Sequence, residues 1–525
     1  MNAILLLYNL IPALNQTKNS RLELQADKET IESPTLPEPL PNSPQPEISK
    51  EMRSPEFMSK VMPNVWVYEG EAYDLSDFIK HHPGGEFFIG RMKNRDITTL
   101  VNVLHRHPTK VKKRLQKYAL GRKAVPEDLH PKYNAPPFLF KPDFDGRKDT
   151  PHFNFSKSSQ LLDRIRARVE APAMKAQVDR IDVNFDLVTI VLACVYFIVQ
   201  ILSICFPALM PSYLFVPLMA MLRISLSGAG HYLNHRAQVG WNKFLAHVFD
   251  ITYVPMAFVV VDGHTLMHHP YTQSEVDVKR NVFTAMMELP RYYRVPIHTI
   301  HKLGHVVTGM FVRTFEICLY AVKFGVENFF GDWQRGLPHY LGMITMRLLL
   351  CGELLIFSLN GQLGVWLAQF ILTVWLSTFL IVASHDFEVH ETAANPQADD
   401  DWAAFQIENA YDLSMVGNKY IDCFLSAGLS PHRVHHVLPY QKSGFANILS
   451  EDIVRDEAEK WGIAWEKPQN FFIDRLPLLI RHYLLSPSRM AESQNLGQVA
   501  EHFHPEALRK TLTYLYEGFI GIGSI

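Results

Sequence analysis

The chain has 525 residues, with 51 lysines and arginines against 53 aspartates and glutamates, so its net charge is −2 when the histidines are neutral. This balance excludes a general nucleic-acid binder, which needs a basic excess to neutralise phosphates. The five cysteines are scattered, and neither a disulfide framework nor a thiolate zinc site is expected. The 24 histidines remain as the residues that can carry the chemistry.

Residues 1–57 are predicted to be a disordered lead-in. The stretch SPTLPEPLPNSPQPE at 33–47 is rich in proline and nearly free of large apolar side chains, so it cannot bury enough surface to become ordered. The opening MNAILLLYNLIPAL is apolar but lacks a basic start and a small-residue cleavage site. We therefore expect neither a signal peptide nor a membrane span there.

A small soluble domain is predicted for residues 58–124, where short apolar runs alternate with turns. Residues 65–85 read VWVYEGEAYDLSDFIKHHPGG, which places His82 before a Pro-Gly-Gly turn. Two further histidines, His105 and His107, follow the stretch Asp96–Thr98. Residues 125–182 are polar and contain prolines, and we interpret them as a linker on the membrane surface.

Two uncharged runs, 187–222 and 354–384, predict an all-α integral membrane domain over 183–480, followed by a C-terminal tail at 481–525. One crossing needs about 20 apolar residues. Each run has turn-forming residues near its middle, so we predict two transmembrane hairpins with about four spans. The third span needs residues before Glu353, which places Arg347 and Glu353 in or near the bilayer; mutual pairing or snorkelling would explain them.

Three histidine clusters follow the runs or lie between them: GHYLNHR, DGHTLMHHP and SPHRVHHVLP. A spacing of three or four residues places two imidazoles on one face of a helix, where they can bind one metal. Eight imidazoles exceed the needs of a single metal, so two metals are implied. A further pair, His385 and His390, follows the last predicted span. His247, His298, His301 and His305 fit no cluster and are interpreted as ordinary interfacial histidines.

The segment 65–85 resembles the cytochrome b5 domain. In that family the HPGG histidine is an axial heme ligand, which corresponds to His82, and a second histidine follows an Asp-x-Thr stretch. Spacing from Asp96 favours His105, with His107 as the alternative. The resemblance therefore implies a small α+β domain that holds heme b between two imidazoles. Such a heme transfers electrons and does not bind oxygen, because both axial positions are filled.

The cluster pattern HX3H, HX3HH and HX2HH, together with residues 401–439, resembles the cytochrome b5-fused membrane fatty acid desaturases, both front-end and sphingolipid enzymes. Their clusters hold a non-heme di-iron centre in a cytosolic histidine-rich cap. The resemblance implies nine metal ligands, with His385 favoured over His390: His231, His235, His264, His268, His269, His385, His432, His435 and His436. One departure concerns regiochemistry, since the front-end branch begins its third cluster with Gln where this chain has His432.

This resemblance implies an O2-dependent desaturase that inserts a double bond into a fatty acyl or sphingoid chain. Electrons would come from NADH-cytochrome b5 reductase through the heme. A lipid hydroxylase of the same di-iron class is one alternative, and a non-catalytic membrane-anchored heme or metal-binding protein is another. The expected location is the endoplasmic reticulum membrane, with multiple spans and with both termini and the active site cytosolic, because the predicted lumenal turns carry no lysine or arginine.

Overall fold

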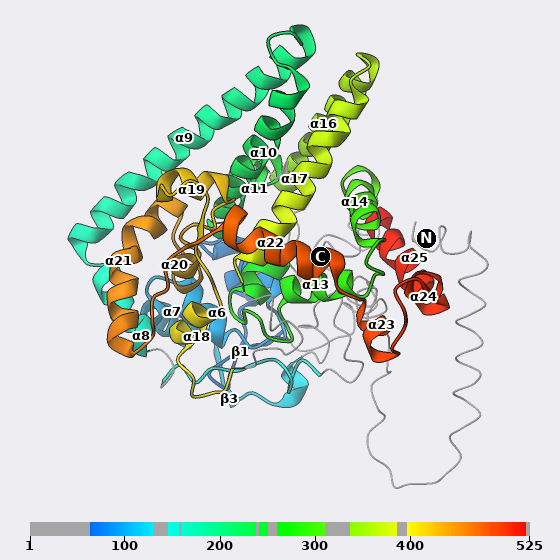
Figure 1. Ribbon diagram of the computed structural model, residues 1–525. Helices are drawn as coiled ribbons and strands as arrows, with labels where there is room; N and C mark the ends of the chain where they lie inside the picture. Colours follow the sequence, from blue (N-terminus) through cyan, green and yellow to red (C-terminus); the bar gives the residue numbers. More distant parts are fainter. Residues whose placement is uncertain are drawn as a thin grey trace, which may run out of the picture.

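The computed structural model describes residues 64–129, 145–156, 160–237, 241–249, 260–309, 337–385 and 396–520. The lead-in predicted for residues 1–57 lies outside these ranges, as does His390. Four long helices project from one side of a body that contains the other described elements (Figure 1). They are α9 (Pro172–Cys205), α10 (Ser212–His235), α16 (Leu337–Leu359) and α17 (Leu363–Ala383).

The first described element is a three-stranded antiparallel sheet in the order β1 (Trp66–Tyr68), β2 (Glu71–Tyr73) and β3 (Ala119–Lys123). Glu69 and Gly70 join β1 to β2, and both have positive φ, as a two-residue hairpin turn requires. Trp66 lies opposite Tyr73, and both side chains are buried. Short helical elements complete this α+β unit: η1 (Ser76–His81), α5 (Glu86–Arg91), α6 (Thr98–Leu104), α7 (Pro108–Leu115), η2 (Gln116–Tyr118) and η3 (Pro126–Asp128).

Three of the long helices, α9, α10 and α17, have the length and apolar composition of membrane spans, as a membrane protein requires. The fourth predicted span corresponds to α16, which is helical but is not among the three that qualify. The prediction of four spans in two hairpins therefore stays a prediction. The linker predicted for residues 125–182 overlaps the first turns of α9, which begins at Pro172, where proline fits the first helical turn. The charged residues in the first turns of α9 precede the uncharged run, which begins at residue 187.

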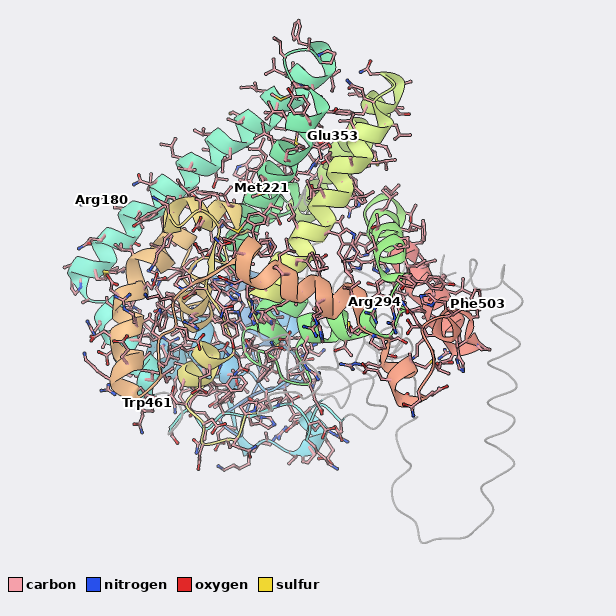
Figure 2. All side chains as sticks on the ribbon, viewed as in Figure 1. Arg180, Met221, Arg294, Glu353, Trp461 and Phe503 are labelled. Carbon is pink, nitrogen blue, oxygen red and sulfur yellow. The ribbon has the colours of Figure 1, made fainter. Side chains whose placement is uncertain are left out.

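Arg347 and Glu353 do not pair as the sequence suggested. The carboxylate of Glu353 on α16 instead accepts hydrogen bonds from Arg223 of α10 and Tyr196 of α9. Gln200 Nε2 also donates to it, at 2.8 Å. Glu353 lies partway along the projecting helices (Figure 2), where an unpaired charge would be costly. Three of the long helices therefore meet at one buried ion pair that carries additional hydrogen bonds.

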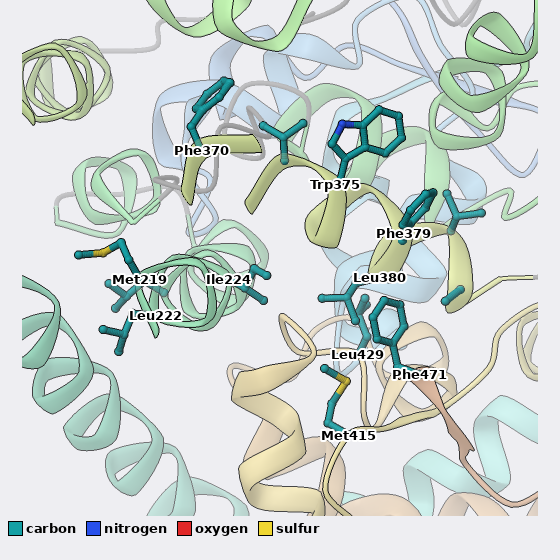
Figure 3. Packing of buried hydrophobic residues seen from close by; sticks show 14 of the residues in the cluster. Met219, Leu222, Ile224, Phe370, Trp375, Phe379, Leu380, Met415, Leu429 and Phe471 are labelled. Carbon is teal, nitrogen blue, oxygen red and sulfur yellow. The ribbon is translucent and has the colours of Figure 1, made fainter. Parts of the chain in front are cut away.

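The apolar core continues from the long helices into the body. Leu380 of α17 lies beside Leu429 and Phe471, which belong to the later part of the chain (Figure 3). This part includes two short parallel strands, β4 (Leu413–Ser414) and β5 (Gln469–Asn470). Five helices of the body form what we call the cap: α8 (Gln160–Val169), α18 (Trp402–Glu408), α19 (Lys419–Leu425), α20 (His432–Val437) and α21 (Gly444–Trp461).

The remaining described elements lie along the base of the long helices and beside them (Figure 1). Residues 481–525, predicted to be a tail, contain helices, and the longest of these packs against α14. The elements are α11 (Trp241–Val248), η4 (Val260–His268), α13 (Val278–Met287), α14 (Arg294–Gly304), η5 (His305–Gly309), η7 (Phe471–Arg475), α22 (Leu476–Leu479), η8 (Ile480–Leu485), α23 (Arg489–Ser493), α24 (Ala500–Phe503) and α25 (Pro505–Ile520).

Candidate metal centre

The first histidine cluster ends α10. His231 and His235 lie one turn apart, and their Nε2 atoms are 3.2 Å from each other. The preceding run of small residues lets the helix approach its neighbours closely. A Cβ on Gly228 would lie 2.7 Å from the backbone of Ala427, in the turn that leads to the third cluster. The sequence SGAG therefore brings the first cluster against the third.

The second cluster lies on a π-helix, η4, and not on the α-helix expected from its spacing. The His269 amide donates to the carbonyl of His264 at 3.0 Å, five residues back. This wider turn brings the Nε2 atoms of His264 and His269 to 2.9 Å from each other. Nε2 of His264 is also 2.7 Å from Nε2 of His231. Turns of π-helix are frequent at functional sites.

The third cluster lies on the short helix α20. His432 and His436 are one turn apart, and their Nε2 atoms are 3.1 Å from each other. Asp412 holds the start of this helix, because its carboxylate accepts from the Arg433 amide at 2.9 Å. The ring of His435 lies on another side, with its centroid 4.6 Å from that of His231. The short helix α20 thus directs His436 and His435 toward two different sets of histidines.

Eight of the nine histidines predicted as metal ligands form two neighbouring groups. In each group the possible ligand nitrogens lie within 4.8 Å of one another. The first group contains one histidine pair from each of the first two clusters and one residue from the third: His231, His235, His264, His269 and His435. The second group contains His268, His385 and His436. His432 lies beside this second group through its contact with His436.

The donor set fits metal ions. Imidazole nitrogens suit iron, zinc and copper, and a metal ligand has to be neutral. Burial and the surrounding histidines hold the pKa of His269 and of His436 well below the usual range, so both are neutral. Neutral imidazoles whose Nε2 atoms meet at about 3 Å cannot all satisfy one another, because each has one proton to donate. Metal ions between these nitrogens would satisfy them.

In the second group, a hydrogen bond at Nδ1 orients each ring. The carboxylate of Asp277 is 2.8 Å from Nδ1 of His268. Burial raises the pKa of Asp277, but the charge and hydrogen bond of His268 outweigh that effect and lower the pKa to about 2. His385 and His432 reach the backbone carbonyls of Asn409 and Ser384 at 2.9 Å. These contacts leave Nε2 as the nitrogen that faces the group, as outer partners of metal ligands do.

His436 has two side-chain partners at Nδ1: Gln406 Oε1 at 2.9 Å and Thr272 Oγ1 at 3.1 Å. Gln406, Thr272 and Asp277 are not among the residues predicted from the sequence. Gln406 and Thr272 lie 30 and 164 residues from His436 in the sequence, so spacing gives no signal for either of them. Asp277 lies only nine residues after His268, so it could have been predicted as an acidic residue that follows a histidine cluster closely.

A separate pair of rings lies in the N-terminal domain. The centroids of His82 and His105 are 6.2 Å apart. Two metal–nitrogen bonds of about 2 Å each account for about 4 Å of that distance, and the ring radii account for the rest. Nδ1 of His82 reaches the carbonyl of Gly85 at 2.8 Å, and Nδ1 of His105 reaches that of Val101 at 3.1 Å. The exposed His107 does not face His82. The spacing of the two rings would therefore admit one metal ion between them.

The other histidines considered in the sequence lie apart from both groups. His298 and His301 on α14 and His305 at the start of η5 are buried and belong to neither group. The side chain of His247 and all of His390 lie outside the described part of the chain.

The architecture therefore defines a membrane protein that joins an N-terminal heme-type domain to a helical domain with a histidine-rich metal centre. Residues 56–124 match the cytochrome b5-like heme/steroid binding domain, and residues 207–443 match the fatty acid desaturase family. The chain belongs to the fatty acid desaturases that carry a fused cytochrome b5 domain, and it is a fatty acid desaturase by class of enzyme.

Two curated relatives support this assignment at low identity. The "Probable Delta(5) fatty acid desaturase C" of Dictyostelium discoideum is 22% identical over 413 residues, which cover 71% of this chain and 82% of the relative. The "Cytochrome b5-related protein" of Drosophila melanogaster is 22% identical over 395 residues, which cover 73% and 80%. No solved structure gives a significant match.

Proposed function

We propose that this chain is a membrane-bound desaturase that inserts a double bond into a fatty acyl chain at a di-iron centre. One observation carries the proposal: eight histidines from four segments converge in two adjacent buried groups, and His432 contacts the second group through His436. His231, His235, His264, His269 and His435 would hold one iron. His268, His385, His432 and His436 would hold the other, with Asp277 orienting His268.

We propose in addition that His82 and His105 hold heme b. With two iron ions bound, the centre would supply the oxidising chemistry that removes two hydrogens from neighbouring methylenes and, with O2, two electrons and two protons, yields an alkene and two waters. No ordinary side chain is basic enough to remove such hydrogens, which is why the reaction would need the chemistry of a bound metal. An NADH-dependent cytochrome b5 reductase is the proposed source of the electrons.

We propose a fatty acyl substrate with a front-end position for the new bond, because the Dictyostelium relative is named as a Delta(5) fatty acid desaturase. His432 stands where the front-end branch has Gln, and it faces His436 in the second group. A histidine there adds one metal-binding nitrogen. Analysis of the products would distinguish three substrates: acyl-coenzyme A, a phospholipid acyl chain and a sphingoid base.

The proposed location is the endoplasmic reticulum membrane, with the metal centre and heme domain on the cytosolic side. The end of α10 at His235 and the end of α17 next to His385 lie on the side of the long helices that also carries the N-terminal domain (Figure 1). Protease added to sealed microsomes should therefore digest the heme domain. Protection of that domain would contradict this topology.

Lipid profiling tests the activity. Yeast cells that express the full chain and receive a panel of fatty acids should contain unsaturated chains that cells with His264→Ala lack. Hydroxylated products of unchanged unsaturation would support the hydroxylase alternative and reject desaturation. Purified protein that contains zinc, lacks iron and consumes no O2 on reduction would support the non-catalytic alternative, which is compatible with a relative named only as cytochrome b5-related.

A further inference from the structure

The π-helix that carries the second histidine cluster has a second, apolar side. Leu266 and Met267 lie between His264 and His268. Leu266 is 3% exposed and belongs to the buried core of the N-terminal domain, together with Trp66, Ile79 and Leu100. Met267 packs against the same core. One turn of chain therefore faces the metal centre with its histidines and the heme domain with its apolar residues.

The heme domain makes the reciprocal contact. Val103 on α6 lies two residues before His105, and it is fully buried in the core of the cap. That core includes Val434 and Val437 of α20, the helix of the third histidine cluster. Leu104 packs against both cores. Each domain thus inserts a residue into the other, and each inserted residue lies within two positions of a proposed metal ligand.

Polar contacts surround this apolar interlock. Arg166 of α8 donates to the carbonyl of Val103 at 3.0 Å, and its guanidinium lies over the ring of Tyr440 at 5.4 Å. Asp96, near the start of α6, lies 3.6 Å from His152 in the segment before α8. Domains of one chain move relative to each other by default unless a hydrophobic interface holds them. The contacts here are of the kind that holds two domains in one arrangement.

We propose that this interlock, formed by Leu266 and Met267 on one side and Val103 and Leu104 on the other, is the electron-transfer contact between the heme domain and the metal centre. The proposal rests on the function proposed above. One electron would pass at a time: ferrous heme becomes ferric, and one ferric non-heme iron becomes ferrous. Two such transfers precede each turnover with O2, and neither transfer needs a proton. The interlock would keep the donor continuously in its productive position, without a search by diffusion.

Heme re-oxidation in the full-length protein tests the proposal. The double variant Val103→Ala/Leu266→Ala shortens both inserted side chains and leaves every histidine in place. After chemical reduction and mixing with O2 and substrate, its heme should re-oxidise about tenfold more slowly than in the wild type, because the docked arrangement is populated for only part of the time. Leu120→Ala is the matched control, since Leu120 lies on β3 of the N-terminal domain and its side chain is exposed.

The heme spectrum and the iron content are measured on each variant, so loss of a metal site is seen separately. Arg166→Ala provides a second variant, which removes the hydrogen bond to the Val103 carbonyl at the interface. Because the Arg166 charge also acts on His105, the heme midpoint potential of this variant is measured as well; with that potential unchanged, it should slow re-oxidation in the same direction. Wild-type rates in both variants, with heme and iron intact, would overturn the proposal. A wild-type protein that binds heme and iron but never couples heme re-oxidation to O2 would instead overturn the proposed function.

Discussion

Two regions in the described part of this protein are rich in buried histidines, and they differ in how the imidazole nitrogens are arranged. In the metal centre the rings come from four segments, and many pairs meet nearly at right angles, as for His269 and His435 at 4.5 Å and 85°. In the other region the three histidines come from one continuous segment, with His298 and His301 on α14 and His305 at the start of η5. His298 and His301 lie almost parallel at 6.3 Å and 4°, and His305 continues the row at 15°.

The two regions also differ in what their nitrogens contact. In the metal centre Nε2 faces Nε2. On α14, His298 contacts the hydroxyl of Tyr514 at 2.8 Å, and His301 donates to the Tyr514 carbonyl at 2.6 Å. A single straight helix spreads its imidazoles along one line, whereas a metal needs donors from several directions. Convergence of separate segments, and not the number of histidines, distinguishes the metal centre.

The largest effect is expected for His264→Ala. Its Nε2 lies at the centre of the first group, close to those of His231 and His269. Removing a ligand should cost more than the loss of an outer partner, so product should fall by more than about 100-fold. Iron analysis should show less metal, while the heme spectrum stays unchanged. Normal activity and normal iron in this variant would mean that the first group is not a metal site.

Heme binding distinguishes the facing rings from an adjacent solvent-exposed histidine. His105→Ala should abolish the low-spin heme spectrum, because His105 is the ring that faces His82. His107→Ala should leave the spectrum intact, because that side chain is exposed. Both spectra are recorded on the full-length protein. Loss of heme with His107→Ala alone would show that the assignment of the second ligand is wrong.

Heme uptake should fail only when the pH approaches about 4. Burial, and next the charge of His82, lower the pKa of His105 to about 4. Because a ligand imidazole has to be neutral, His105 stays able to bind iron as the pH falls from 7 to 5 and loses this ability as the pH passes through about 4. Titration of heme into the apo-protein across this range measures the change. A midpoint near 6.5, the ordinary histidine value, would contradict it.

Asp277→Asn should have an intermediate effect. The substitution keeps the shape of the side chain and removes the charge that orients His268. Outer partners of metal ligands are worth about 10–100-fold in metal affinity or activity. Iron content at limiting iron, together with product yield, should fall within that range. Asp452→Asn is the matched control, since Asp452 is 85% exposed in its ion pair, and surface pairs contribute little.

The smallest effect on chemistry is expected for His301→Ala in the α14 row. The variant loses the hydrogen bond to the Tyr514 carbonyl and the ring stack on Tyr514, which should lower stability by about 1–3 kcal/mol. Iron content, heme spectrum and most activity should remain. Thermal unfolding measures the first effect, and metal analysis measures the second. Loss of iron in His301→Ala with an otherwise folded protein would remove the distinction between the two regions.

Much of this site could be predicted from local sequence. The turn HPGG and the stretch after Asp96 identified His82 and His105 as candidates. The cluster spacings identified eight histidines, seven of which lie in the two groups, and the eighth group member, His385, was identified by its place after the last predicted span. Their division between the two groups could not be predicted. The second cluster was expected on an α-helix, but the π-turn brings His264 to His269 and leaves His268 with the second group.

The sequence by itself determined the residue types, because imidazoles at helical spacing and long uncharged runs carry their chemistry wherever they fold. Only the tertiary structure decided which residues meet across the chain. Arg223, and not Arg347, pairs with Glu353, and Leu266 enters the heme domain. The physical reason is that helix periodicity specifies neighbours within one segment, whereas contacts between segments depend on how their surfaces pack.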